Sequence, residues 1–147
     1  LMNRKHSIDR YLEIFYNLKE INPNIEFSSD FIIGYPGEEN QDFKDTLNLI
    51  KKVKFINSYS FIFSPRPGTV AAGLELIDKK ISNKRLEKIQ NQLFENQIIK
   101  NKSLENKILN VLVENLTDDK TQVFGRSEYM TPVIFDILNS LEYSLYE

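Results

Sequence analysis

Apolar residues recur every three or four positions in two segments of the first half of the chain, and this spacing predicts two helices. The first helix is expected to begin after Ser7, whose side-chain oxygen can cap it, and to stop at Asn22-Pro23, because proline cannot continue the hydrogen-bond ladder. The second helix is expected to be capped by Asn40. The apolar faces comprise Tyr11, Ile14, Phe15 and Leu18 in the first helix, and Phe43, Leu47 and Ile50 in the second.

Two further segments of the first half have the composition of strands. Residues 25–35 contain the apolar run Phe31-Ile32-Ile33, and residues 58–63 are rich in aromatic side chains, which we place in the core. The alternation of helices and strands predicts a parallel sheet in an α/β fold. Since a parallel sheet is covered on both faces and two strands are too few for one, this part is expected to be the last part of a larger unit.

The second half of the chain changes character. A long helix is predicted from Ser82 to about Leu104, and its apolar positions include Leu86, Ile89, Leu93, Phe94 and Ile98. Short strands at 108–114, 122–126 and 133–135 follow it. Turn residues between the first two of these strands favour a small antiparallel β unit, joined to the first part by the helix.

The composition narrows the class of protein. With 147 residues, 41% hydrophobic and 27% charged, the chain has the make-up of a globular domain. It has no apolar run near the roughly 20 residues of a membrane span, and residues 1–5 lack the apolar stretch of a secretory signal. We therefore expect a cytoplasmic protein with no membrane partner. It has no cysteine and one histidine, which excludes thiolate ligation of zinc or of an iron–sulfur cluster within this chain.

Charge is unevenly distributed along the chain. Residues 78–107 carry eight Lys or Arg against four acids, whereas residues 108–147 carry two against seven, and the whole chain has a net charge of -2. The basic segment is either a solvated helix face or a surface that contacts RNA phosphates. An overall acidic chain does not indicate DNA binding.

The segment 28–38 carries the most chemical information. Small polar residues, Ser29 and Asp30 among them, precede a Gly34-Tyr35-Pro36-Gly37-Glu38 turn. The carboxyl ends of parallel strands line active sites, and glycines let a ligand approach the backbone closely. The alternative is a plain strand–turn–helix whose glycines only satisfy the backbone conformation.

This segment closely resembles the strand–turn segment of the radical-SAM methylthiotransferases, especially the branch that modifies isopentenyladenosine in tRNA. Other blocks resemble the same family in the same order. They are Leu1-Met2-Asn3-Arg4-Lys5-His6-Ser7, Asp42-Phe43 with Thr46, Ser58 to Ala72, Arg85-Leu86, and Leu112-Val113-Glu114 with Gly125-Arg126-Ser127-Glu128. Any one of these blocks is weak evidence for the family, but their occurrence in this fixed order is specific for it.

The resemblance implies an architecture. Residues 1–78 would be the C-terminal part of the radical-SAM domain, the last part of a partial (β/α) barrel. Residues 79–107 would be a linking helix, and 108–147 an incomplete small β-barrel, the tRNA-binding TRAM domain, which departs from the family after about 135. The implied reaction uses S-adenosylmethionine (SAM) and two 4Fe-4S clusters to methylthiolate an isopentenylated adenosine beside the anticodon.

The resemblance also implies roles for single residues on the SAM side, namely Ser29, Asp30, Gly34, Pro36, Gly37, Glu38, Arg66 and Arg4. On the tRNA side, positive charge makes Lys84, Arg85 and Lys88 of the basic segment and Arg126 of the β unit the candidates for phosphate contacts. No catalytic or metal-ligating residue is expected here, because the family's cluster cysteines are absent. We therefore expect a C-terminal fragment that is inactive without the missing N-terminal part of the enzyme.

Two alternatives stay open at this point. One is a sister enzyme that acts on threonylcarbamoyl-adenosine in tRNA or on an aspartate of a ribosomal protein. The other is a non-catalytic RNA-binding remnant, which the missing cysteines and imperfect barrel favour.

Overall fold

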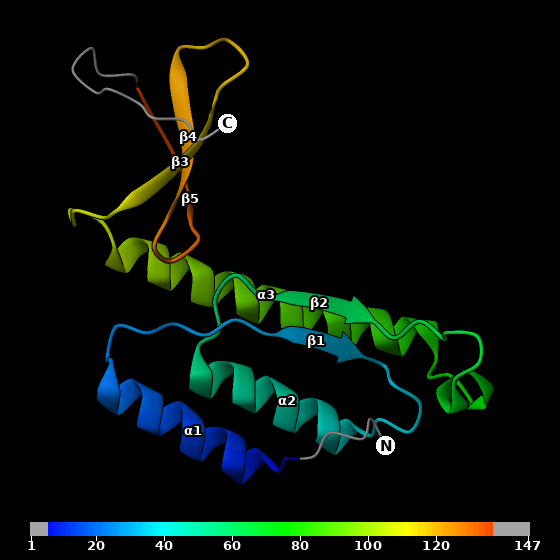
Figure 1. Ribbon diagram of the computed structural model, residues 1–147. Helices are drawn as coiled ribbons and strands as arrows, with labels where there is room; N and C mark the ends of the chain where they lie inside the picture. The colour runs from blue at the N-terminus through cyan, green and yellow to red at the C-terminus, as the bar shows by residue number, and fades with distance from the viewer. Residues whose placement is uncertain (1–5, 137–147) are drawn as a thin grey trace. The chain divides into compact units, whose positions relative to one another are not determined.

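A computed structural model describes residues 6–136 of the chain (Figure 1). The chain divides into two compact units, residues 1–97 and 98–147, and the division falls inside its longest helix. The domain boundaries expected at 78 and 107 stay predictions.

The first unit alternates helices and strands, as the sequence predicts. In chain order it holds α1 (Ile8–Ile21), β1 (Asp30–Ile33), α2 (Asn40–Val53), β2 (Tyr59–Ile62), the short 3₁₀ helix η1 (Val70–Gly73) and most of α3 (Lys79–Ser103). The Ser7 hydroxyl caps α1 by accepting a hydrogen bond from the Arg10 N–H at 3.3 Å. This confirms the expected start of that helix.

Two helix starts differ from the prediction. The residue that caps α2 is Glu39, whose N–H donates to the Asp42 carboxylate at 2.7 Å, and Asn40 is the first helical residue. Helix α3 starts at Lys79, because the Asp78 carboxylate accepts from the Lys80 and Ile81 N–H groups. An aspartate at this position satisfies backbone donors that would otherwise lack partners.

The strand predicted at 25–35 is confined to Asp30–Ile33. Serine hydroxyls bond to the backbone just before it. The Ser28 hydroxyl donates to the Asn57 carbonyl at 2.8 Å, and the Ser58 hydroxyl accepts from the Ser29 N–H at 3.0 Å. Side-chain bonds of this kind compete with the regular ladder and delay the start of the strand.

Strands β1 and β2 pair in parallel, with Asp30 opposite Tyr59 and Ile32 opposite Phe61. This confirms the parallel α/β character of the unit. Its core lies on one face of the pair, where Phe31 and Ile33 pack with side chains of all three long helices. Figure 1 shows α1 and α2 running along the same side of the two strands. The other face carries no such layer within the described part of this unit.

The placement of β2 aromatic residues in the core is wrong. The side chains of Tyr59 and Phe61 are 66% and 55% exposed, and Ile32 on the neighbouring strand is 41% exposed. Because successive side chains of a strand point to opposite faces, these three share the face away from the helices. We call Asp30, Ile32, Tyr59 and Phe61 the open sheet face.

The second unit contains the end of α3 and a sheet of three antiparallel strands, β3 (Val111–Leu116), β4 (Gln122–Ser127) and β5 (Pro132–Asp136), in that order. The predicted β unit is thus present, and its strands differ from the expected ranges by a few residues. The β3–β4 register shifts between Val113 and Asn115, where a bulge lies. The expected departure from the family pattern after about 135 falls almost wholly outside the described residues.

Within residues 6–136, no helix combines the length and the apolar character that crossing a bilayer requires.

Candidate functional site

The turn after β1 is held in an unusual backbone conformation. Gly34 has φ of 74° and Gly37 has φ of 84°, both in the left-handed region that glycine adopts without strain. The Glu38 N–H closes the turn by donating to the Tyr35 carbonyl at 2.9 Å. Gly34 is buried against α3, where an added Cβ would lie 2.6 Å from the Ser82 hydroxyl oxygen. The glycine is therefore required both for its φ and for the contact with the helix.

The Glu38 carboxylate holds this turn from within. Its Oε2 accepts a hydrogen bond from the Gly34 N–H at 2.8 Å, and its Oε1 accepts one from the Arg85 Nη1 at 2.7 Å. The side chains of Glu38 and Arg85 are only 12% and 9% exposed, so water screens the pair weakly. Glu38 was expected on the SAM side; the structure engages both of its oxygens within the protein.

Arg85, expected to contact tRNA, is buried instead. Its guanidinium also donates to the Glu38 carbonyl at 3.1 Å and to Asn40 Oδ1 at 2.8 Å, and it lies 5.5 Å above the Phe43 ring centroid. A phosphate contact needs an exposed cation. Nothing in the run of basic residues indicates that Arg85 points inward. Its position on the buried side of α3, together with Ser82 and Ile89, explains why it does.

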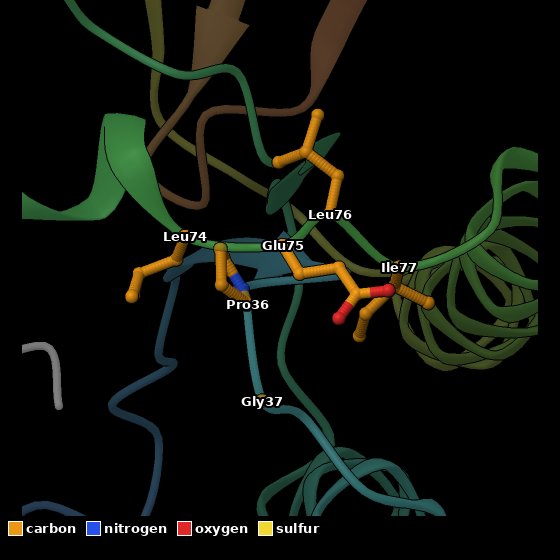
Figure 2. Close-up of a pocket in the computed structure, with 6 residues that line it drawn as sticks. All are labelled: Pro36, Gly37, Leu74, Glu75, Leu76 and Ile77. Atoms are coloured by element: carbon orange, nitrogen blue, oxygen red, sulfur yellow. The ribbon is translucent and has the colours of Figure 1, made fainter.

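A pocket of about 470 Å³ lies beside the turn (Figure 2). Pro36 and Gly37 form one wall. The extended segment that precedes α3 forms the other, with Leu74, Glu75, Leu76 and Ile77. Sequence reasoning missed this segment, because a short apolar stretch after a proline-containing loop has no distinctive pattern.

The other residues expected on the SAM side lie apart from this turn. Ser29 and Asp30 are at the amino end of β1, whereas the turn follows its carboxyl end, about 13 Å away at the usual rise of a strand. Arg66 lies exposed in the loop after β2, where its carbonyl accepts from the Thr69 hydroxyl at 2.8 Å. Arg4 lies outside the described residues.

The open sheet face is a second candidate surface of the first unit. The Tyr59 and Phe61 rings are nearly parallel, at 14°, with centroids 6.4 Å apart. Asp30, which stands opposite Tyr59 in the register, adds an exposed carboxylate. The alternation of residues along 58–63 was the available signal, because the aromatic residues stand two positions apart, which places successive rings on one face of a strand.

Lysines form a stripe on α3. Lys80, Lys84 and Lys88 are exposed and repeat every four residues, so they share one side of the helix. The buried residues of α3 lie on the opposite side, and they are Ser82, Arg85, Ile89, Leu93 and Asn96. Two of the four residues expected to contact tRNA, Lys84 and Lys88, thus present their charges to solvent.

Arg126 is the expected tRNA contact of the second unit. Its Nε donates to the Glu114 carboxylate at 2.9 Å, and its guanidinium lies 5.7 Å from the Phe124 ring centroid. The pair is about one-third exposed, with values of 39% and 34%, so solvent screens it substantially.

The donor set of the chain does not fit an iron–sulfur cluster. The full sequence contains no cysteine, and within the described residues no group of three or more His, Cys, Asp or Glu side chains is arranged to hold a metal ion. No step of a reaction is therefore assigned to a cluster on this chain.

Comparison with known proteins identifies the relatives of the chain. It is 71% identical over 136 residues to the tRNA-2-methylthio-N(6)-dimethylallyladenosine synthase of Pelagibacter ubique, a match that covers 92% of this chain and 30% of the relative. Proteins of the same name from Orientia tsutsugamushi and Bartonella bacilliformis are 42% and 38% identical over 99% and 92% of the chain. The chain is homologous to one part of these synthases.

The resemblance described from the sequence motifs is thus confirmed, and it falls on the branch named for dimethylallyladenosine. The chain spans less than a third of the length of these curated synthases, between 30% and 32%. No protein-family model matches the chain.

Proposed function

We propose that the chain is the C-terminal part of a tRNA methylthiotransferase that acts on dimethylallyladenosine. The observation that carries this proposal is the 71% identity to the Pelagibacter ubique synthase across nearly the whole chain. Identity of this degree, which runs through both structural units, favours the same substrate branch over the sister enzymes.

The layer arrangement of the first unit supports its proposed place in a (β/α) barrel. Parallel strands with helices on one face and an open second face have the layout of a barrel segment, whose inner face is completed by other strands. In this arrangement the open sheet face and the turn 34–38 belong to the interior and the carboxyl-end rim, where barrel enzymes bind their ligands.

We place part of the SAM molecule in the pocket beside the turn, and the chemistry of the lining residues supports this. Leu74, Leu76 and Ile77 offer apolar contacts for the adenine ring, and the Glu75 carboxylate offers a partner for the cationic groups of SAM. Gly37 leaves the backbone accessible beside them. When bound, SAM supplies the methyl group and the radical chemistry of the reaction; this chain's residues bind and orient it and exclude water.

For tRNA, the proposed contacts are the exposed lysines of α3 and, on the second unit, Arg126. Phosphate neutralisation by lysine gives sequence-independent affinity, which suits a surface that positions the substrate. The ion pair with Glu114 reduces the charge that Arg126 presents, so we give the lysines the larger part.

A chimera tests the proposal. This chain replaces the matching segment of the Pelagibacter ubique synthase in a host that lacks its own methylthiotransferase, and tRNA nucleosides are analysed by mass spectrometry. We expect the methylthio nucleoside to appear with the chimera and to be absent with the chain alone. A folded, cluster-loaded chimera that makes no product, beside an active parent enzyme, would contradict the proposal and favour the RNA-binding remnant.

A further inference from the structure

Arg85 connects α3 to the turn 34–38 through several bonds at once. Its Nη1 donates to both Oε1 and the main-chain carbonyl of Glu38, at 2.7 and 3.1 Å, and its Nη2 donates to Asn40 Oδ1 at 2.8 Å. The Phe43 ring packs below the guanidinium at 5.5 Å. The Arg85 side chain thus contacts three places: the end of the turn at Glu38, the start of α2 at Asn40, and the buried face of α2 at Phe43.

The second oxygen of Glu38 transmits this restraint to the start of the turn. Oε2 accepts the Gly34 N–H at 2.8 Å, and Gly34 has the left-handed φ that sends the chain toward Pro36. A carboxylate this deeply buried is costly without a cationic partner. If the charge of Arg85 were removed, Glu38 would turn toward water and the Gly34 N–H would be left without its acceptor.

The helix also restrains the turn sterically. Ser82, one turn before Arg85 on the same buried side of α3, fills the space that a Cβ at Gly34 would need. The turn therefore takes its shape from two residues of α3, and the walls of the pocket at Pro36 and Gly37 follow from that shape.

We propose that Arg85 is a positioning residue, which acts through Glu38 to hold the Gly34–Gly37 backbone in its ligand-binding conformation. The identity of this ligand as SAM rests on the proposed function. An arginine is needed because three acceptors in different directions match its planar fork of donors, whereas the lysine ammonium is a single point charge.

Hydrogen exchange in this chain provides a first test, independent of catalysis. Arg85→Met keeps much of the apolar stem and removes the charge, and Arg85→Lys keeps the charge without the fork. Asn96→Leu is the matched control, because Asn96 is also buried on α3 but donates to the Ile50 and Phe55 carbonyls. We expect the Gly34 amide to exchange about tenfold faster in both Arg85 variants, after correction for global stability, and to stay unchanged in Asn96→Leu.

The affinity for SAM provides the second test, in the chimera with the Pelagibacter ubique synthase. Equilibrium dialysis with labelled SAM is expected to show binding weakened about tenfold by Arg85→Met and unaltered by Asn96→Leu. Unchanged Gly34 exchange in the Arg85 variants would overturn the inference whatever the chimera does. Faster exchange with unaltered SAM affinity would overturn the ligand-binding role. An inactive unmodified chimera that still binds SAM would count against the proposed reaction, and the Arg85 comparison would still decide the positioning role.

Discussion

At the scale of single residues, two glycines share a left-handed backbone conformation but differ in how closely other atoms surround them. Gly34 and Gly68 both have left-handed backbone, with φ of 74° and 81°. A Cβ at Gly34 would collide with Ser82, whereas a Cβ at Gly68 would meet nothing within 4 Å. Alanine at Gly68 would therefore cause backbone strain alone, whereas alanine at Gly34 would cause both backbone strain and crowding.

We expect Gly68→Ala to lower the free energy of unfolding by about 1 kcal/mol, the usual cost of a left-handed alanine. Gly34→Ala adds overpacking and should cost about 2–4 kcal/mol. Urea denaturation of both variants measures the difference. Equal losses of stability at the two positions would show that Ser82 moves aside without resistance.

Asp119 gives a prediction in acid. Hydrogen bonds from the Thr117 and Thr121 hydroxyls, and from the Thr121 N–H, lower the pKa of its carboxyl from 3.8 to about 2. Because the folded pKa lies below the unfolded one, this stabilisation is present above about pH 4 and disappears as pH falls through about 2. NMR titration of the turn should give a midpoint near 2, and Thr121→Val should raise it. A midpoint that Thr121→Val leaves unmoved would contradict the assigned cause.

The sequence predicted the turn at 34–38, because glycine and proline have recognisable local conformational requirements. It did not predict the roles of Glu38 and Arg85, which stand 47 positions apart along the chain. An isolated charge in a sequence looks the same whether its partner is a phosphate or a buried carboxylate. Only the packing of α3 on the turn distinguishes them.

At the scale of elements, α3 carries two different kinds of surface on opposite sides. One side is buried and polar at both ends, and the other carries the lysine stripe. The apolar spacing predicted the helix and two of its core residues, Ile89 and Leu93. The same spacing also included Phe94, which is exposed. Phe94 directly follows the buried Leu93, and adjacent residues lie about 100° apart around a helix, so the two side chains point to different sides.

The lysine stripe predicts a salt-dependent RNA affinity. Lys84→Glu with Lys88→Glu should weaken binding to any tRNA and reduce the salt slope by about 0.7–0.9 for each phosphate that the helix no longer neutralises. The control, Lys44→Glu with Lys51→Glu, makes the same change in net charge at exposed positions of α2. Filter binding across a salt series measures both. Equal weakening by the two pairs would mean that only net charge matters.

At the scale of the whole molecule, the open sheet face is the largest departure from expectation in the first unit. We expected the aromatic residues of the segment 58–63 to lie in the core. The structure buries Phe31 and Ile33 completely enough to form a core, and it leaves Tyr59 and Phe61 uncovered. Both faces carry aromatic and aliphatic side chains, so only the position of the helices decides which face is covered.

The open sheet face predicts dye binding and self-association of the isolated chain. Tyr59→Ser with Phe61→Ser should reduce fluorescence of a hydrophobic dye and leave the melting temperature nearly unchanged, because these side chains are exposed. Phe94→Ser, at an exposed position of α3, is the control and should have little effect on the dye. An equal drop in fluorescence with the control would locate the apolar surface elsewhere.

The contribution of α3 to the core has a consequence for the order of events during synthesis. Ile89 and Leu93 close a core whose other buried members all lie between residues 15 and 55. A ribosome releases the strands and both earlier helices first, so a nascent chain must wait until α3 emerges before those side chains are shielded. At about 5–20 residues per second, that interval lasts seconds, and it exposes Ile50 and Phe55 to any chaperone near the exit tunnel.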